Sequence, residues 1–277
     1  MNSIKTILVH LANDADHMAR LKLAYNLARR HQAHVEALYV VSPISLPAGA
    51  TGRGASANYI SEAVQIAREK SAEVEAEFRR WCQEHQVSYS WTASEGEHLA
   101  LLHEHAHYAD LAVVSQTDPS NLEEMLFNEL PSHLPMVSSC PTIVLPHSST
   151  DDDIPGERAL IAWKGPHQGS RSVRNALPLL SLANTVTALV VEGDEATKDS
   201  ARRMAAWLSH HGIQVKIEYA DRRGRTIAQT ILEEVGRCGC DLLVMGGRTR
   251  SRLTELMFGS VTEEILKNCR LPMLMSR

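Results

Sequence analysis

The residues best suited to chemistry lie between Met245 and Val261. Two glycines open this segment, three arginines alternate after them, and a Gly-Ser pair precedes a helical pattern at 261–268. Glycine lets backbone N–H groups approach a phosphate closely, and a helix start offers unused N–H donors and the positive end of a dipole. Ser260 is expected to cap that helix or to donate its hydroxyl to a phosphate oxygen. The segment therefore predicts a site for phosphate or another anion, formed by Gly246, Gly247, Arg248, Arg250, Gly259 and Ser260.

A second basic cluster, Arg222–Arg225, follows the third expected strand of the same half of the chain. The carboxyl ends of parallel strands meet at one edge of a sheet, so both clusters are expected to face one crevice. The alternative is a glycine turn followed by solvated arginines, because charge runs usually lie on solvated surface.

The elements that must position these residues alternate between short Val/Ile/Leu runs and helical patterns. In the first half we expect strands at 6–11, 34–41, 87–92, 111–115 and 142–145, and helices at 18–31, 59–84, 98–108 and 122–138. The second half repeats the pattern from 159 to 275. Continuous apolar strands between helices indicate a parallel sheet covered on both faces. The expected fold class is α/β, with two tandem doubly wound domains of five strands each.

The two halves are an internal duplication. Asp110–Val114 matches Asp241–Met245 at an offset of 131 residues, and the same offset pairs Phe127 with Phe258. The segment 147–156 between the halves is polar and ends in Pro-Gly, which is typical of a linker. We therefore expect one domain at 1–150 and a second at 156–277, paired with each other as a pseudo-dimer.

The glycine segment resembles a known family. After the run Asp-Leu-Leu-Val-Met, the chain has the spacing Gly-x2-Gly-x9-Gly-Ser/Thr at Gly246, position 249 and Gly259-Ser260. This spacing resembles the nucleotide-binding signature of the universal stress protein family. The resemblance covers both halves as a tandem arrangement. It implies Rossmann-like domains of the adenine nucleotide alpha hydrolase-like type that pair through their last strands, and it implies ATP or a related nucleotide as ligand. The residues that it implies as the binding site are Ala162, Trp163, Lys164, Val191, Met245, Gly246, Gly247, Arg248, Arg250, Gly259, Ser260 and Val261.

Two residues depart from the family pattern. Thr249 stands where the family has its second glycine, and a threonine with positive φ would be strained, so either the loop is expected to differ or the site is expected to be weaker. Lys164 stands where nucleotide-binding members usually carry an acidic residue. Lysine cannot accept hydrogen bonds from a ribose or an adenine amine, although it could reach a phosphate.

The first half serves as an internal control for the anion site. At the same offset Ser115 and Gln116 replace the two loop glycines, Asp118 replaces Thr249, and Asn128-Glu129 replaces the Gly-Ser pair. Carboxylates would repel a phosphate there, by about 4 kcal/mol for unit charges ~4 Å apart at an effective dielectric of ~20. The first half is therefore expected to be a degenerate site.

Three other features were weighed as sites. His98, His103, His105 and His107 lie on the expected 98–108 helix, and His103 and His107 have the i,i+4 spacing of a helical metal pair. Leu99 and Leu102 belong to the apolar stripe of this helix, which places the histidines on flanking or solvated faces and predicts no metal site. Cys238-Gly-Cys240 is expected to be structural rather than redox-active. The segment 52–57 matches G-x-G-x-x-A outside the strand–turn–helix context, which favours a loop, with a role as a lid over a neighbouring crevice left open.

Composition excludes several classes of function. Residues 1–155 carry 10 Lys/Arg and 20 Asp/Glu, whereas residues 156–277 carry 18 and 13, so one half is acidic and the other basic. A pI near 6.3 and 5% aromatic residues argue against nucleic-acid binding. No apolar run approaches the ~20 residues of a membrane span. Five scattered cysteines and the lack of a signal sequence predict a cytoplasmic protein.

The sequence thus predicts a cytoplasmic stress-response protein that binds a nucleotide or another phosphorylated ligand in its second half. Two alternatives remain open. One is a ligand-free scaffold that pairs with itself, as a homodimer, or with partner proteins. The other is weak nucleotide hydrolysis, although no catalytic base is evident beyond Glu255, the nearest carboxylate.

Overall fold

The computed structural model describes residues 3–12, 14–41, 57–118, 124–147, 155–247, 249–252 and 255–277. Its first half alternates strands and helices in the expected order. The elements are β1 (Thr6–Leu11), α1 (His17–His31), β2 (His34–Val41), α2 (Ala57–Glu84), β3 (Tyr89–Glu95), α3 (His98–His105), the 3-10 helix η1 (Ala106–Tyr108), β4 (Leu111–Ser115), the 3-10 helix η2 (Glu124–Phe127), α4 (Leu130–Val137) and β5 (Thr142–Leu145).

The second half repeats this order and adds a short hairpin before its last helix. The elements are β6 (Arg158–Ala162), α5 (Pro166–Leu180), β7 (Thr185–Val191), α6 (Glu195–Ser209), β8 (Val215–Ala220), α7 (Ile227–Arg237), β9 (Leu242–Gly246), β10 (Thr249–Arg252), β11 (Glu255–Phe258), α8 (Ser260–Asn268) and β12 (Met273–Ser276).

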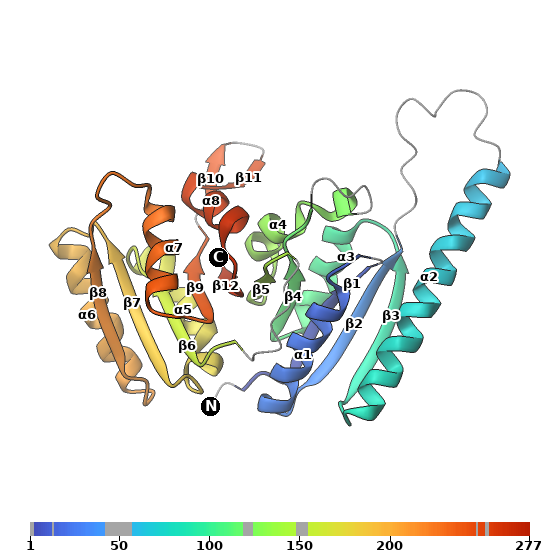
Figure 1. Ribbon diagram of the computed structural model, residues 1–277, viewed down its shortest axis with the longest axis horizontal. Coiled ribbons are helices and arrows are strands. Elements are labelled where there is room, and N and C mark those ends of the chain that lie inside the picture. Colours follow the sequence, from blue (N-terminus) through green and yellow to red (C-terminus); the bar gives the residue numbers. More distant parts are fainter. Residues whose placement is uncertain are drawn as a thin grey trace.

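All strands except the hairpin form one sheet of ten strands, in the order β3-β2-β1-β4-β5-β12-β9-β6-β7-β8. Within each half the strands are parallel, and the halves join where β12 runs antiparallel to β5, with Leu274 opposite Ile143. Figure 1 shows the two halves on either side of this junction, with α2 along the outer edge of the first half. The predicted pairing through the last strand of each half is confirmed.

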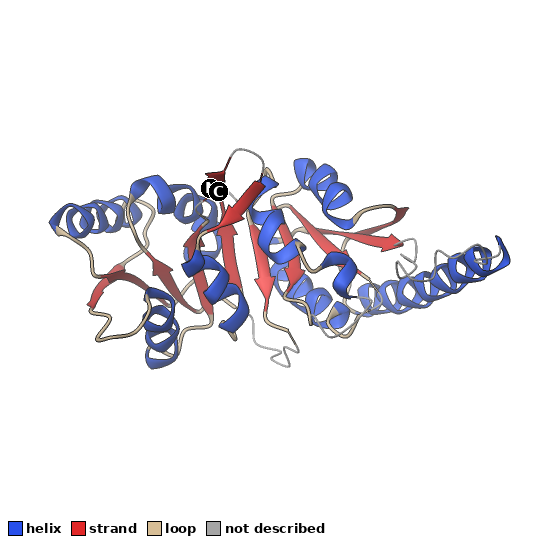
Figure 2. Ribbon diagram, turned by 90° about the horizontal axis from the view of Figure 1, so that it is seen from above, coloured by secondary structure: helices blue, strands red, loops and turns tan. Residues whose placement is uncertain are grey.

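Helices cover both faces of the sheet, which Figure 2 shows from above. Two buried apolar layers fill the spaces between sheet and helices. One layer includes residues of α1, α2, α5 and α6, and the other includes residues of α3, α4, α7 and α8. Each layer draws on both halves of the chain, so the core runs without interruption across the junction. The expected fold class is confirmed.

Two local predictions are wrong. The helix expected at 122–138 is instead a 3-10 turn at η2 followed by the separate helix α4, and residues 119–123 lie outside the described part of the chain. Pro131 lies in the first turn of α4, where its missing N–H costs nothing, so the helix begins there rather than running through. The strand expected at 87–92 is displaced to Tyr89–Glu95 at the sheet edge, where half-buried side chains give a weak pattern.

Candidate functional site

A cavity of about 90 Å³ opens at the carboxyl ends of three strands of the second half. The strand order reverses between β6 and β9, which is where open α/β sheets bind ligands. The cavity's floor comes from β6, β7 and β9, and its walls come from α7, α8 and the loop after β6. Its lining residues are Ala162, Trp163, Lys164, Gly169, Leu189, Val191, Ile227, Ile231, Met245, Gly246, Val261 and Thr262. Seven of the twelve residues predicted as a binding site therefore lie around one cavity.

Two glycines shape the chain after β6, one at the N-cap of α5 and one inside its first turn. Gly165 has φ +126°, a conformation that favours glycine, and it is the N-cap of α5, directly before Pro166. Gly169 packs against the indole of Trp163, where a Cβ would lie 2.7 Å from Cε3. The Nε1 of Trp163 donates to Ser200 Oγ at 3.0 Å, and the ring is 5% exposed. Trp163 therefore belongs to the core beneath the cavity as well as to its lining.

The wall formed by α7 is set by local sequence. Thr226 and Gln229 form a capping box, in which each side chain accepts a hydrogen bond from the other residue's backbone N–H. Ile227, Ile231 and Val235 then follow at a spacing of four and place an apolar stripe toward the sheet. Thr226 Oγ1 also donates to Glu264 Oε1 of α8 at 3.0 Å. Ile227 and Ile231 were absent from the predicted site, although the capping box and this stripe could have indicated them.

The helix α8 begins at the mouth of the cavity. Gly259 is its N-cap and Ser260 its first residue, with no side-chain capping hydrogen bond. The prediction that Ser260 caps the helix is therefore wrong, because Ser260 stands one position inside it; its side chain is exposed. The N–H groups of a first helical turn have no partner within the helix, so Ser260 and Val261 offer donors at this end. Gly247 N, in contrast, donates to Ser276 O at 3.2 Å.

The loop between β9 and α8 differs from a plain glycine turn. Thr249 begins β10 and pairs with Phe258 of β11 in an antiparallel hairpin, in which the backbone is extended. The expected difference at this position is thus confirmed, because an extended threonine avoids the strain of a left-handed one. Arg248 lies outside the described residues, and for Arg250 the structure describes the backbone alone.

The Arg222–Arg225 cluster does not line the cavity. Arg222 Nε lies 2.5 Å from Glu192 Oε2, and Arg225 forms an ion pair with Glu233. These pairs are largely exposed and neutralise two of the arginines. The expectation that both basic clusters face one crevice is therefore not met by Arg222 and Arg225. Lys164, which is exposed, is the one charged residue of the described cavity lining.

Comparison with known proteins now adds to this geometry. The family model of the universal stress proteins matches residues 3–146 and 169–277. The chain belongs to the universal stress protein family. A search of curated proteins found no match.

Solved structures show the same fold. A universal stress protein from Archaeoglobus fulgidus DSM 4304 is similar with a TM-score of 0.76 and 14% identity, over 98% of this chain and 96% of that one. A putative universal stress protein from Pseudomonas aeruginosa UCBPP-PA14 is similar with a TM-score of 0.56 and 16% identity, over 99% and 93%. A functionally unknown protein from Pseudomonas aeruginosa PAO1 is similar with a TM-score of 0.57 and 16% identity, over 99% of this chain and 92% of that one. At these identities the likeness shows the fold alone.

In the first half of this universal stress protein, the counterpart of the cavity is filled by aromatic rings. His10 stands at the position of Ala162 on the first strand, and His98 stands, like Ile227, directly after the N-cap of its helix. His10 Nε2 lies 2.9 Å from His98 Nδ1, and both rings pack on Phe127. Burial lowers the pKa of His10 well below its usual value and that of His98 to about 4. Both imidazoles are therefore neutral at pH 7.

A buried arginine closes the same region. Arg20 is 0% exposed; its Nη2 lies 2.5 Å from Asp14 Oδ2, its Nη1 donates to Ser115 Oγ and its Nε to the His10 carbonyl. Since Ser115 takes the place of Gly246, this network occupies the strand ends that form the cavity floor in the second half.

The histidines of α3 and η1 have different roles. The prediction that they lie on solvated faces is wrong for His98, which is 3% exposed, and right for His107, which is exposed. His105 Nδ1 lies 2.5 Å from Glu36 Oε1, so it forms an ion pair when protonated. His103 and His107 contact each other edge to face, with ring centroids 4.9 Å apart. His98 is buried because it starts the helix at the strand ends.

The thiol of Cys240 is not activated. Cys238 and Cys240 are half-buried and form no disulfide. Burial raises the pKa of Cys240 to about 11, so its thiol stays protonated at pH 7 and is a poor nucleophile. The G-x-G-x-x-A segment that begins at Gly52 lies outside the described residues, apart from Ala57, which begins α2.

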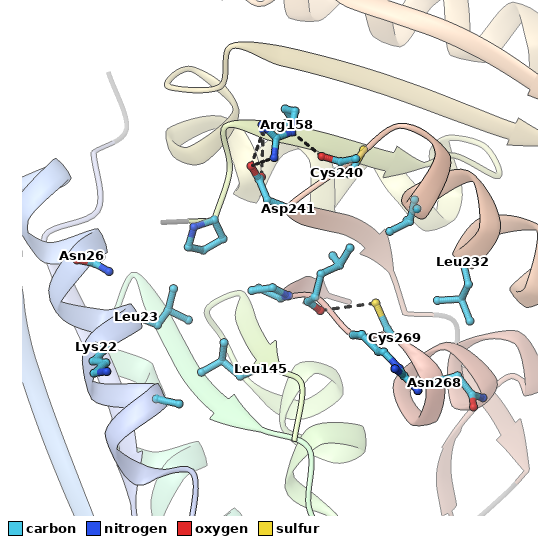
Figure 3. Close-up of a pocket in the computed structure, with 18 residues that line it drawn as sticks. Lys22, Leu23, Asn26, Leu145, Arg158, Leu232, Cys240, Asp241, Asn268 and Cys269 are labelled. Carbon is cyan, nitrogen blue, oxygen red and sulfur yellow. Dashed lines mark hydrogen bonds and ion pairs between the residues drawn. The ribbon is translucent and has the colours of Figure 1, made fainter. Parts of the chain in front are cut away.

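A larger pocket of about 440 Å³ lies at the junction of the halves (Figure 3). Lys22, Leu23 and Asn26 of α1 face residues of the second half across it, with Leu145 between them. Arg158, a charged residue of its lining, has its Nη2 3.9 Å from Asp241 Oδ2 and donates a hydrogen bond to the Gly239 carbonyl. A related pocket of about 500 Å³ includes Asp110, the counterpart of Asp241. Both pockets lie mainly at the amino ends of parallel strands, although Leu145 at the carboxyl end of β5 also lines the larger one, so the smaller cavity is the better candidate.

Among the helices that the structure describes, none combines the length and the apolar character that a bilayer crossing requires.

Proposed function

We propose that the second half of this universal stress protein binds an adenine nucleotide such as ATP, or another phosphorylated ligand. One observation carries the proposal: an apolar cavity at the strand-order reversal lies beside both the glycine pair after β9 and the first turn of α8. A flat apolar ring fits the cavity, and the phosphates lie outside it. The cavity of about 90 Å³ is far smaller than the ~300–1,000 Å³ of pockets that enclose whole ligands.

Each residue has a distinct part in this arrangement. Ala162, Val191 and Met245 contact the base, and Trp163 supports the floor from below. The N–H groups at the start of α8 and the Ser260 hydroxyl bind phosphate, because a helix start carries donors and a positive dipole end. Lys164, Arg248 and Arg250 neutralise the phosphate charge, and Gly246, Gly247 and Gly259 let the backbone approach it.

The first half holds no nucleotide in this proposal. The rings of His10, His98 and Phe127 fill the position of the base, and Arg20 is fully engaged by Asp14 and Ser115. The first half contributes instead the partner strand β5 and its share of the core. The protein acts as a binding module of the cytoplasmic stress response rather than as a turnover enzyme, and its unpaired cysteines suit a reducing compartment.

The test is isothermal titration of the full chain with ATP, ADP and AMP. We expect one nucleotide per chain, with a dissociation constant below the millimolar range. Val261→Glu places a carboxylate in the cavity lining, where it repels phosphate and base alike, and should weaken binding at least about tenfold. Leu182→Glu introduces the same residue at an exposed position and should bind as the wild type does. No binding in the wild type, or equal binding by Val261→Glu, would overturn the proposal.

A ligand-free scaffold is the second candidate function, and the β10–β11 hairpin favours it. The hairpin pairs Thr249 with Phe258 at the position where the family signature has its second glycine, and Lys164 lacks the acceptor oxygens of an acidic residue. The double variant Thr249→Gly plus Lys164→Asp restores the family pattern. If the variant binds ATP and the wild type does not, the scaffold function is supported; if the wild type binds as well as the variant, it is rejected.

A further inference from the structure

The first half brings three metal-ligating side chains together at the carboxyl ends of its strands. Asp16 lies in the loop after β1, Glu124 begins η2 after β4, and His147 follows β5. One ligand atom from each residue lies within 4.8 Å of the other two. In the described part of the chain this is the only such group of three. The three residues are separated by up to 131 positions in sequence, so spacing alone could not indicate them.

Burial distinguishes this group from an exposed acidic patch. Asp16 is 3% exposed and Glu124 is 1% exposed, whereas the His147 side chain is 32% exposed. Two carboxylates held this close in a buried place repel each other, and a cation between them offsets both that repulsion and the cost of burial. The partly exposed imidazole leaves an approach from solvent.

One contact joins two members of the group, and backbone hydrogen bonds hold Asp16 and Glu124 in place. His147 Nδ1 lies 2.8 Å from Asp16 Oδ2. The backbone N–H of Asp118 donates to Glu124 Oε2 at 2.7 Å, and the backbone N–H of Asp16 donates to Asp14 Oδ1 at 2.8 Å. In a tetrahedral site with metal–ligand distances of about 2.1 Å, ligand atoms lie about 3.4 Å apart. Closure on a metal therefore requires the contact between His147 and Asp16 to widen and the longest separation, at most 4.8 Å, to shorten by up to about 1.4 Å.

The donor set selects the class of metal. One imidazole nitrogen with two carboxylate oxygens suits Zn²⁺ or Mn²⁺. Ca²⁺ and Mg²⁺ prefer oxygen ligands only and gain little from an imidazole. We propose that Asp16, Glu124 and His147 form a binding site for a divalent transition-metal ion of the Zn²⁺ type in the first half of the chain.

The position of this site relates it to the second half. Glu124 corresponds to Glu255 at the offset of 131, so the site occupies the loop region that follows the fourth strand in both halves. The acidic half then binds a cation where the basic half binds an anion. The proposed metal site does not depend on the proposed nucleotide site, because the two sites lie on different halves of the sheet.

The test is calorimetric titration of the EDTA-treated full chain with Zn²⁺, Mn²⁺ and Mg²⁺. Elemental analysis after dialysis then counts the metal ions that stay bound to each chain. We expect one tightly held Zn²⁺ per chain, with Mg²⁺ bound far more weakly. His147→Ala removes a half-exposed ligand without disturbing the core and should weaken Zn²⁺ binding at least about tenfold, as should Glu124→Gln. Circular dichroism of each metal-free variant checks that it is folded.

Matched controls separate this site from other histidines and cysteines. The double variants His103→Ala plus His107→Ala and Cys238→Ser plus Cys240→Ser should keep the Zn²⁺ affinity of the wild type. No stoichiometric Zn²⁺, unchanged affinity in folded His147→Ala, or loss of the ion only in a control variant would each overturn the proposal. The metal-site variants should bind ATP with the affinity of the wild type. Failure of the metal proposal is therefore distinguishable from failure of the nucleotide proposal.

Discussion

Single residues decide which half of this universal stress protein has an open site. Ala162 and Ile227 leave a cavity beneath α8, whereas His10 and His98 fill the equivalent space with two hydrogen-bonded rings. Burial keeps both rings neutral, so the stability of the first half depends on pH. The close contact between Gly169 and Trp163 is the corresponding constraint in the second half.

The Gly169 contact predicts a specific sensitivity to a single methyl group. In Gly169→Ala the new Cβ would lie 2.7 Å from Trp163 Cε3, so α5 or the indole must shift. We expect a loss of about 1–3 kcal/mol in the free energy of unfolding, measured by urea denaturation. Gly236→Ala is the matched control in a helix, since its Cβ would meet nothing within 4 Å, and it should be neutral or stabilising by up to about 1 kcal/mol. Equal effects of the two changes would contradict this packing.

The histidine pair predicts how stability changes with pH. The folded-state pKa of His98 is about 4, below the unfolded value near 6.5, because burial disfavours the charged form. A group with a lowered folded pKa contributes stability above its unfolded pKa and loses it as pH falls toward the folded value. Stability should therefore fall between pH 6.5 and 5, by up to about 1.4 kcal/mol per pH unit for each histidine that charges on unfolding.

The double variant His10→Ala plus His98→Ile tests this assignment by installing the residues of the second half. Urea denaturation at several pH values should show a flatter dependence between pH 6.5 and 5 than in the wild type. His210→Gln, at an exposed position, should leave the dependence unchanged. A double variant with the wild-type slope would show that other groups cause it.

At the scale of elements, the site depends on how α7 and α8 begin. The capping box fixes the first turn of α7, and Thr226 Oγ1 reaches Glu264 of α8, so one side chain links the two walls of the cavity. The start of α8 at Gly259-Ser260 then sets where its donors point.

Thr226→Ala should therefore affect both stability and binding. Loss of the cap should cost about 1 kcal/mol in the free energy of unfolding, and loss of the link between α7 and α8 should weaken nucleotide binding severalfold. Thr226→Ser keeps the hydroxyl and should restore both quantities in denaturation and titration experiments. If Thr226→Ser behaves as Thr226→Ala does, the hydroxyl is not the cause.

The elements also show what sequence patterns could and could not predict. The bounds of β1, β2, β4 and β5 agree with the prediction, because buried parallel strands are continuous apolar runs between helices. The break between η2 and α4 was missed because the apolar period continues across it, although Pro131 marked the new start. The ion pairs of Arg222 and Arg225, and the group of Asp16, Glu124 and His147, depend on contacts between distant segments that no local spacing encodes.

At the scale of the whole molecule, the chain is one sheet with two cores that cross the junction. The pairing of β5 with β12 buries Leu274 opposite Ile143, both 0% exposed, and each apolar layer includes residues of both halves. The acidic first half and the basic second half are joined without a solvent gap at this pairing. The two halves are therefore expected to unfold together.

This arrangement predicts a single cooperative unfolding transition for the wild type, with the same midpoint by calorimetry and circular dichroism. Leu274→Asp buries an unpaired carboxylate at the junction and should lower the free energy of unfolding by more than about 4 kcal/mol. Leu182→Asp, at an exposed position, should change it by less than about 0.5 kcal/mol. Two separate transitions in the wild type would show that the halves are independent.

The central claim is that the second half alone binds a nucleotide, with its base in the cavity between β6, β9 and α8. The most direct measurement is the electron density of crystals of the full chain grown with saturating ATP. The account predicts density for one nucleotide per chain, with the adenine against Ala162 and Val191 and the phosphates at Gly246 and Ser260. Density in the first half, density in the pocket at the junction, or none in the cavity at saturation would contradict it.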